Sequence, residues 1–373
     1  MKDRGLYIHI PFCQAKCAYC DFYSLAGDVL HEKYVDALCK SISLLGGKFA
    51  DTEFTTVYIG GGTPSILSAH LLKKLLYALH ENFSVPSDAE ITVEANPATI
   101  DDYKISAMLS GGVNRLSFGC QSANSSELKM LSRLHTFDQF IDSFNMAREH
   151  GIKNISVDLM YGIPLQTTTS LLDSIERVSD LSPDHISLYG LRVEPDTPFG
   201  RAKDLPLPSD DIQCEMYLRA CEKLSHLGYG RYEISNFAKN GRFSRHNLRY
   251  WKRGEYLGLG AAAHSYIDGV RYAYARDVAS YIRSLENGTM PSPCESEILT
   301  RSDELCEAVI LPLRLEEGLD LSEFENEFSK EEKDTLLERV RPYLGKFIIF
   351  DGDRLKFNSE GFLVSNTILS QII

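Results

Sequence analysis

Six short runs of β-branched and aromatic residues alternate with helix-like segments in the first part of the chain, and this alternation limits the possible folds more than any other feature. The strand-like runs span residues 5–12, 55–62, 90–97, 114–122, 154–162 and 185–193. The helix-like segments include residues 30–45, 68–82 and 137–150. Such alternation indicates parallel βα units. Six units predict an α/β fold with a partial (β/α)6 barrel of the TIM type, rather than a closed barrel of eight units.

Most of the polar and Gly/Pro-rich motifs in these units come at or just after the end of a strand. They include residues 60–64 (Gly-Gly-Gly-Thr-Pro), 94–97 (Glu-Ala-Asn-Pro), 119–122 (Gly-Cys-Gln-Ser) and 158–162 (Asp-Leu-Met-Tyr-Gly). The carboxyl ends of barrel strands share one mouth, which is where active sites lie. The sequence therefore predicts a single functional site at this mouth.

The pattern changes beyond residue 200. Ser209 is expected to cap a helix that runs to His226. Residues 228–274 are rich in Gly and aromatic side chains and form the least regular part of the sequence. The Pro-containing stretch 288–296 is expected to be a linker.

The last segment of the chain is predicted to form a smaller α+β module. Helical patterns at 303–311, 321–327 and 330–340 precede a hairpin pattern at 346–350 and 354–357. This order resembles a winged-helix module, but its frequent acidic residues favour packing over DNA binding. We therefore predict a barrel at 1–235, a Gly- and aromatic-rich extension at 236–290 and a winged-helix-like domain at 291–373.

Charge and hydropathy argue against several classes of function. The chain has 39 Lys and Arg against 52 Asp and Glu, a net charge of −13, and no basic cluster suited to nucleic acid. No apolar run approaches the ~18–20 residues that a membrane span needs. Residues 1–5 lead directly into the first strand without an apolar signal segment, so a cytoplasmic location is expected.

Three of the nine cysteines form a Cys-x3-Cys-x2-Cys motif directly after the first strand: Cys13, Cys17 and Cys20. Three thiolates this close together predict a metal centre. A structural zinc site needs a fourth ligand, which nearby only His9 offers. A [4Fe–4S] cluster usually takes four cysteines, so three leave one iron open to an exogenous ligand. The spacing therefore favours an iron–sulfur cluster over zinc.

This motif, placed at the start of a barrel pattern, resembles that of the radical S-adenosylmethionine (SAM) proteins. The resemblance implies that the methionyl amine and carboxylate of SAM chelate the open iron. The motifs at 7–13, 60–65, 118–122 and 158–164 together resemble the oxygen-independent coproporphyrinogen III oxidase family. The match implies Cys13, Cys17 and Cys20 as cluster ligands. The residues that it implies as contacts for SAM are Tyr7, Tyr19, Gly61, Gly62, Thr63, Glu94, Gln121, Arg133 and Asp158.

Two departures from the oxidases bear on the reaction. The oxidases have a further Cys two residues after the third cluster Cys, where this sequence has Phe22. They also have a substantial segment ahead of the cluster, whereas Cys13 here follows only twelve residues. Both features belong to the part of the oxidase that organises the substrate and a second SAM. Their absence argues against oxidative decarboxylation of coproporphyrinogen III, which remains the alternative function.

Residues 246–251 (His-Asn-Leu-Arg-Tyr-Trp) are similar to the His-Asn-x-x-Tyr-Trp motif of heme chaperones that resemble HemW. His246 is a candidate ligand of heme iron, and Tyr250 and Trp251 offer flat apolar surface. On the residues alone, a structural hydrogen bond for His246 and an anchoring role for Trp251 explain the same pattern equally well. The family resemblance favours heme binding. His264 is a second candidate, for which a structural hydrogen-bonding role is favoured.

The sequence leaves three functions to be weighed. The resemblance favours a heme chaperone that holds a [4Fe–4S] cluster and SAM, binds heme and passes it to client apo-hemoproteins, membrane-bound respiratory enzymes among them. A homodimer and docking on a membrane surface stay open. Coproporphyrinogen III oxidase is the alternative. Radical SAM modification of RNA fits the cluster but not the charge of −13, because RNA partners need a cationic surface.

Overall fold

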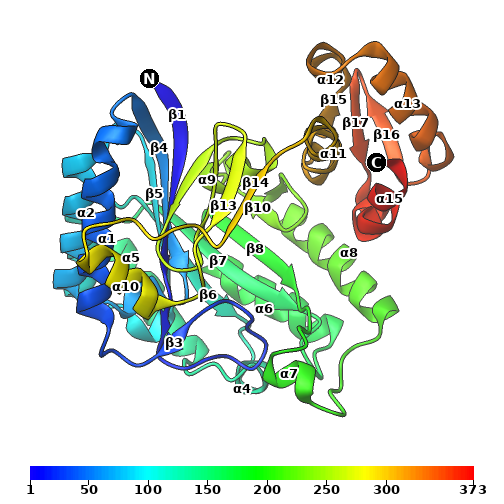
Figure 1. Cartoon of the computed structure of the whole chain (residues 1–373). Coiled ribbons are helices and arrows are strands. Elements are labelled where there is room, and N and C mark those ends of the chain that lie inside the picture. Colours follow the sequence, from blue (N-terminus) through cyan, green and yellow to red (C-terminus); the bar gives the residue numbers. More distant parts are fainter.

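Six parallel strands form the centre of the molecule. In the computed structural model, which describes residues 1–373, each of these strands pairs with the next one in chain order (Figure 1). They are β1 (Lys2–Ile10), β4 (Thr52–Gly61), β5 (Glu90–Ala95), β6 (Arg115–Gln121), β7 (Asn154–Tyr161) and β8 (His185–Gly190). All six lie where the sequence predicts strands, so the partial (β/α)6 barrel is confirmed.

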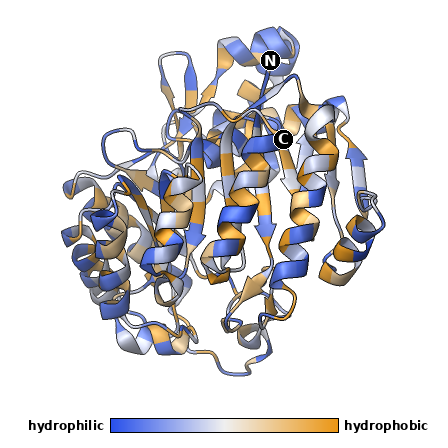
Figure 2. Ribbon diagram, turned by 90° about the vertical axis from the view of Figure 1, so that its left-hand side faces the viewer, coloured by the Kyte–Doolittle hydropathy of each residue, from blue (hydrophilic) through white to orange (hydrophobic).

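Helices cover the outer face of these strands and complete the main hydrophobic core. They are α1 (His31–Gly46), α2 (Ala69–Asn82), α3 (Asp102–Ser110), α4 (Ser125–Met130), α5 (Phe137–Glu149), α6 (Thr168–Asp180) and α8 (Asp210–His226), and Figure 2 shows several of them in front of the sheet. Ser209 caps α8, as predicted. The main core holds 59 buried residues, among them Leu116, Phe118 and Cys120 of β6. Because successive strand residues point to opposite faces, the residues between these three line the interior of the barrel.

Shorter strands extend the central six into a twelve-stranded sheet. On one side lie β11 (Tyr256–Leu259), parallel to β1, then β12 (His264–Ile267), β13 (Val270–Ala273) and β14 (Glu295–Ile298). On the other side, beyond β8, lie β10 (Asn236–Ala238) and β9 (Gly230–Arg231). The stretch expected to be least regular therefore contributes five strands to the sheet, β9 to β13, and the expected linker ends in β14. These strands have four residues or fewer, too few for a pattern of alternation to reveal them.

The C-terminal part of the chain forms a separate small unit. It contains α11 (Arg301–Ile310), β15 (Leu319–Asp320), α12 (Leu321–Glu327), α13 (Lys330–Val340), β16 (Ile348–Asp351), β17 (Arg354–Phe357), α14 (Ser359–Leu363) and α15 (Ser365–Ile372). The helices and the hairpin lie where the sequence predicts them. A second core of 16 buried residues holds the unit together and includes Tyr217 of α8, beside which the unit lies in Figure 1.

The remaining helices are short: α7 (Pro198–Arg201), α9 (Arg245–Trp251) and α10 (Val278–Glu286). α9 packs against β4 and also approaches β1, since a Cβ atom added to Gly5 would lie 3.2 Å from the ring of His246. The His-Asn-x-x-Tyr-Trp motif therefore sits against the barrel strands. No helix of the chain combines the length and the apolar character that crossing a membrane requires.

Candidate functional site

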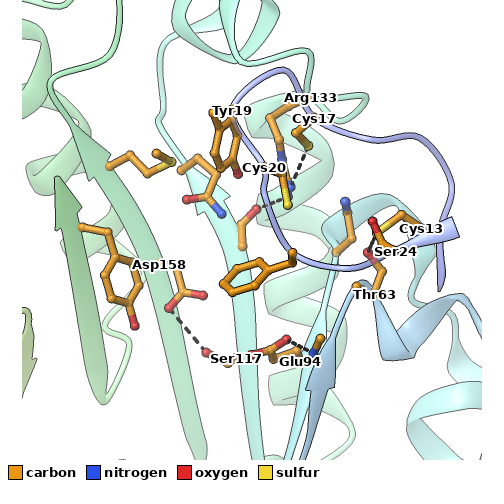
Figure 3. Close-up of a pocket in the computed structure, with 18 of the residues that line it drawn as sticks. Cys13, Cys17, Tyr19, Cys20, Ser24, Thr63, Glu94, Ser117, Arg133 and Asp158 are labelled. Carbon is orange, nitrogen blue, oxygen red and sulfur yellow. Dashed lines mark hydrogen bonds between the residues drawn. The ribbon is translucent and has the colours of Figure 1, made fainter. Parts of the chain in front are cut away.

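A loop that carries the three cysteines lies across a cavity at the carboxyl ends of the strands (Figure 3). The loop is closed at its base by two short parallel strands, β2 (Phe12–Cys13) and β3 (Leu25–Ala26). The cavity has a volume of about 370 Å³. Cys13, Cys17 and Cys20 are all partly buried and all line it. The motif found in the sequence therefore lies at the mouth of the barrel, where the fold predicts a site.

The surroundings of the three thiols fit an iron–sulfur cluster better than zinc. The Thr63 hydroxyl donates to Cys13 Sγ at 3.6 Å, and the Arg133 guanidinium donates to Cys17 Sγ at 3.7 Å. No three His, Cys, Asp or Glu side chains lie together in an arrangement that could hold a single metal ion. His9 is no fourth zinc ligand, since Nδ1 bonds to the Tyr7 hydroxyl at 2.8 Å and Nε2 to a carbonyl at 3.2 Å. Three thiols on one loop beside a ligand-sized cavity fit the donor set that a cluster with one open iron requires.

The Gly-rich loop after β4 brings the cysteine-bearing segment close to the barrel. Gly61 has a φ of +116°, and a Cβ atom there would lie 2.5 Å from the His9 ring. A Cβ atom at Gly62 would lie 2.5 Å from the Phe12 carbonyl oxygen. The amides of Gly62 and Thr63 donate to main-chain carbonyls at the end of β1 and in β2, at 2.9 and 2.7 Å. The lack of side chains at these glycines therefore lets the loop pack closely against the end of β1 and β2, and the loop also lines the cavity.

Two mostly buried carboxylates face the cavity from β5 and β7. Glu94 accepts hydrogen bonds from the Tyr58 hydroxyl at 2.7 Å and from the Gly61 amide at 3.0 Å, and burial raises the pKa of Glu94 to about 7. Asp158 accepts from the Ser117 hydroxyl at 3.4 Å, and burial raises its pKa as well. Figure 3 shows both carboxylates below the cysteine-bearing loop. They are placed to accept hydrogen bonds from the hydroxyl or ammonium groups of a ligand.

Cationic and amide groups lie on the β6 side of the cavity. Arg133 donates to the carbonyl of Gly119, and its Nε is buried without a hydrogen-bond partner. Gln121, at the end of β6, has a φ of +69°, which is uncommon for a residue other than glycine. Arg115, at the start of β6, is only 2% exposed, and its Nε also has no partner. Buried polar atoms without partners are expected where a ligand supplies the missing contacts.

Eight of the nine residues predicted to contact SAM line this cavity, together with the three cysteines. Tyr7 is the exception. Its hydroxyl bonds to His9, and its ring stacks on Tyr58 at a centroid distance of 6.3 Å, so Tyr7 lies behind the cavity wall. Lining residues that the sequence did not predict include Tyr58, Arg115, Ser117, Ser187, Tyr189 and Asn247, and also Lys16, Leu134 and Arg192. For β6 the sequence does contain a usable signal, because side chains alternate along a strand and every second residue from Arg115 to Gln121 lines the cavity.

The motif histidine is built into the structure rather than presented to a ligand. His246 is completely buried; Nδ1 bonds to the Thr56 hydroxyl at 2.9 Å and Nε2 to the Tyr250 hydroxyl at 2.7 Å. Its ring stacks on Tyr58 at 5.3 Å, and burial lowers its pKa to about 3. Both ring nitrogens are hydrogen-bonded within the protein, as the structural alternative describes, and His246 as a heme ligand stays a prediction. His264, the second candidate, is exposed at the start of β12.

Comparisons with known proteins define the class of this fold. Residues 7–178 match the sequence model of the Radical SAM superfamily, and residues 299–364 match that of the HemN C-terminal domain. The structure superimposes on the coproporphyrinogen III oxidase HemN of Escherichia coli, described as a radical SAM enzyme. The TM-score is 0.87 at 26% identity, over 100% of this chain and 90% of that one. The protein therefore has a radical SAM fold, and its family implies SAM and a [4Fe–4S] cluster as cofactors.

Curated relatives narrow the class to one family. The chain is 34% identical to the heme chaperone HemW of Lactococcus lactis over 376 residues, which cover 100% of this chain and 98% of the relative. It is 38% identical to the heme chaperone HemW of Bacillus subtilis over 333 residues, which cover 88% and 87% of the two chains. The chain belongs to the HemW family of radical SAM proteins.

Proposed function

We propose that this protein is a heme chaperone, which binds heme and delivers it to client apo-hemoproteins. The observation that carries the proposal is similarity over nearly the whole chain to relatives that are themselves named heme chaperones. The structural likeness to coproporphyrinogen III oxidase supports the alternative function. Phe22 favours the chaperone: it lines the cavity and is 68% exposed, at the position where the resemblance places a fourth cysteine in the oxidases.

Within this proposal, Cys13, Cys17 and Cys20 hold the cluster, and the cavity below them holds SAM. When bound, the cluster and SAM supply one-electron chemistry and an open iron site. The guanidinium of Arg133 pairs with the methionyl carboxylate, because a planar fork of N–H donors matches a carboxylate. Glu94 and Asp158 accept hydrogen bonds from the ammonium or the ribose hydroxyls. Tyr19, Gly61, Gly62, Thr63 and Gln121 complete the wall of the SAM site.

The proposal also places the protein in the cytoplasm. All nine cysteines are free, and six of them lie outside the cluster motif. A reducing compartment keeps the three cluster thiols available for iron instead of letting them pair as disulfides. The clients are apo-hemoproteins, membrane-bound respiratory enzymes among them, and a homodimer is compatible with the proposal.

Two assays on one preparation test the proposal. Protein with a reconstituted cluster is first incubated anaerobically with SAM, a low-potential reductant and coproporphyrinogen III, and products are separated by chromatography. The same protein is then titrated with heme and mixed with a purified apo-hemoprotein. We expect no vinyl products, saturable heme binding and transfer of heme to the acceptor. Multiple turnovers to protoporphyrinogen would establish the oxidase function instead, and failure to bind heme would rule out the chaperone function.

A further inference from the structure

The rim of the cavity carries large apolar side chains that are exposed to solvent. Phe22 of the cysteine-bearing loop is 68% exposed, and Leu134 of the loop that follows α4 is 56% exposed. Both line the same cavity. They come from two separate segments of the chain, so their convergence is a product of the fold. Exposed apolar groups gathered around a concave site mark a place where a ligand or partner binds.

Two exposed cations share this rim. Lys16 of the cysteine-bearing loop and Arg192, just after β8, both line the cavity. The Arg192 side chain is 86% exposed, and its ion pair with Glu194 at 2.8 Å is a surface contact, which is weak and easily exchanged. The whole chain carries a net charge of −13, so these two cations are opposite in sign to the net charge of the protein. The rim therefore offers an anionic ligand a local attraction that most of the surface does not.

The combination defines the ligand chemically: a broad apolar face with carboxylates at its edge. Heme has this form, since its macrocycle is flat and apolar and its two propionates are anionic. We propose that heme docks across the mouth of the cavity, with its face on Phe22 and Leu134 and its propionates on Lys16 and Arg192. This inference rests on the proposed function and deepens it by naming the heme site. It moves that site from the buried His246 to the rim.

The size of the cavity supports a position over the mouth rather than inside. At about 370 Å³, the cavity lies near the lower end of the range for sites that hold one small molecule. The deeper lining is polar and includes Glu94, Arg115 and Asp158, which suit SAM better than an apolar macrocycle. Heme on the rim then covers the SAM site and leaves room for SAM below.

The residues at the rim also predict how heme is held. The cavity lining contains no histidine, and its only thiols are those of the cluster motif. Binding should therefore depend on the porphyrin face and the propionates more than on iron ligation. Iron-free protoporphyrin IX, which keeps both features, is expected to compete with heme for the site.

The test is a heme titration, followed by absorbance, of protein with a reconstituted cluster and bound SAM. The variants are Phe22→Ala and the pair Lys16→Glu with Arg192→Glu. Matched controls are Tyr103→Ala, an 80% exposed aromatic on α3, and Arg219→Glu, an exposed charge on α8. Loss of the contact between the Phe22 ring and the porphyrin should weaken heme binding on the order of tenfold. Reversal of the charges of Lys16 and Arg192 should weaken it by at least as much. Iron, sulfide and SAM content show that each variant keeps its cofactors.

The outcomes separate this inference from the proposed function. Weaker binding in both rim variants, unchanged binding in both controls and competition by protoporphyrin IX would support the rim site. If wild-type protein binds heme and the rim variants bind it equally well, the rim site is overturned and the chaperone function stands. Strong heme binding that protoporphyrin IX does not displace would also overturn the rim site, because it requires an iron ligand elsewhere. If wild-type protein binds no heme, the proposed function itself fails.

Discussion

The mouth and the floor of the cavity are built in different ways. At the mouth, Cys17, Phe22 and Arg192 stand on loops and are partly or largely exposed. At the floor, side chains on strands and on α9 are buried and hold one another. His246 stacks on Tyr58, and the Tyr58 hydroxyl donates to Glu94 at 2.7 Å. The contrast separates two tasks: loops at the mouth are free to take new ligands, whereas the floor fixes the geometry on which those ligands rest.

The largest effect is expected at the mouth, from Cys17→Ser. A hydroxyl is a poor substitute for a thiolate in holding iron, so the variant should assemble little or no cluster and lose cluster-dependent SAM binding. Iron and sulfide content and SAM binding measure the change. Cys214→Ser, at an exposed thiol on α8, is the matched control. The unfolding midpoint of the cluster-free protein should stay the same, because Cys17 belongs to none of the hydrophobic cores. A fully assembled cluster in the variant would show that Cys17 is not a cluster ligand.

At the floor, His246→Ala should destabilise the fold and leave heme affinity unchanged. The substitution leaves the buried hydroxyls of Thr56 and Tyr250 without their partner and opens a small cavity. We expect a loss of about 2–4 kcal/mol in the free energy of unfolding. Urea denaturation measures the loss, and a heme titration runs beside it. His264→Ala, at an exposed histidine, should cost nearly nothing. A variant with normal stability that no longer binds heme would reverse the assignment.

Glu94 offers a pH test of the floor. Burial raises the pKa of Glu94 to about 7 in the folded protein, above the ~4.3 of an unfolded chain. Between these pH values the folded protein binds one more proton at Glu94 than the unfolded chain does. The contribution of Glu94 to the free energy of unfolding is therefore greatest at low pH and falls as pH rises toward 7. At ~1.4 kcal/mol per pKa unit, this contribution is on the order of 3 kcal/mol. Glu94→Gln should remove it.

Urea denaturation of wild type and Glu94→Gln at pH 5, 6 and 7 measures this contribution. The difference between the two proteins isolates Glu94 from Asp158 and Glu233, whose pKa values are also raised by burial. Wild type should lose stability relative to the variant as pH rises. Parallel curves for the two proteins would mean that Glu94 is ionised throughout this range.

The same contrast explains what the sequence could predict. The mouth carries spaced motifs, such as the three cysteines and the Gly-rich loop, and the strand ends of a barrel converge there, so these residues could be predicted. Lys16, Leu134 and Arg192 also line the cavity but belong to no motif, so they could not. The floor is made of single polar residues inside apolar strands, such as Arg115, whose inward direction depends on strand parity. The burial of His246 depends on where α9 packs, and contacts such as that with Thr56, 190 positions away in the chain, cannot be read from local pattern.

Tyr7 gives the smallest expected effect and the finest test of where the cavity wall lies. The resemblance assigns it to SAM, whereas its hydroxyl bonds to His9 at 2.8 Å behind the wall. Tyr7→Phe removes one buried hydrogen bond, so we expect a loss of about 1 kcal/mol in stability and a change of less than about twofold in the Kd for SAM. Tyr19→Phe, at a tyrosine that lines the cavity, is the matched comparison and should weaken SAM binding more. Calorimetric titration of SAM into both variants decides whether Tyr7 lies behind the cavity wall or contacts SAM. A larger loss of affinity in Tyr7→Phe than in Tyr19→Phe would mean that Tyr7 turns into the cavity when SAM binds, and that β1 contributes to the wall as well as to the support behind it.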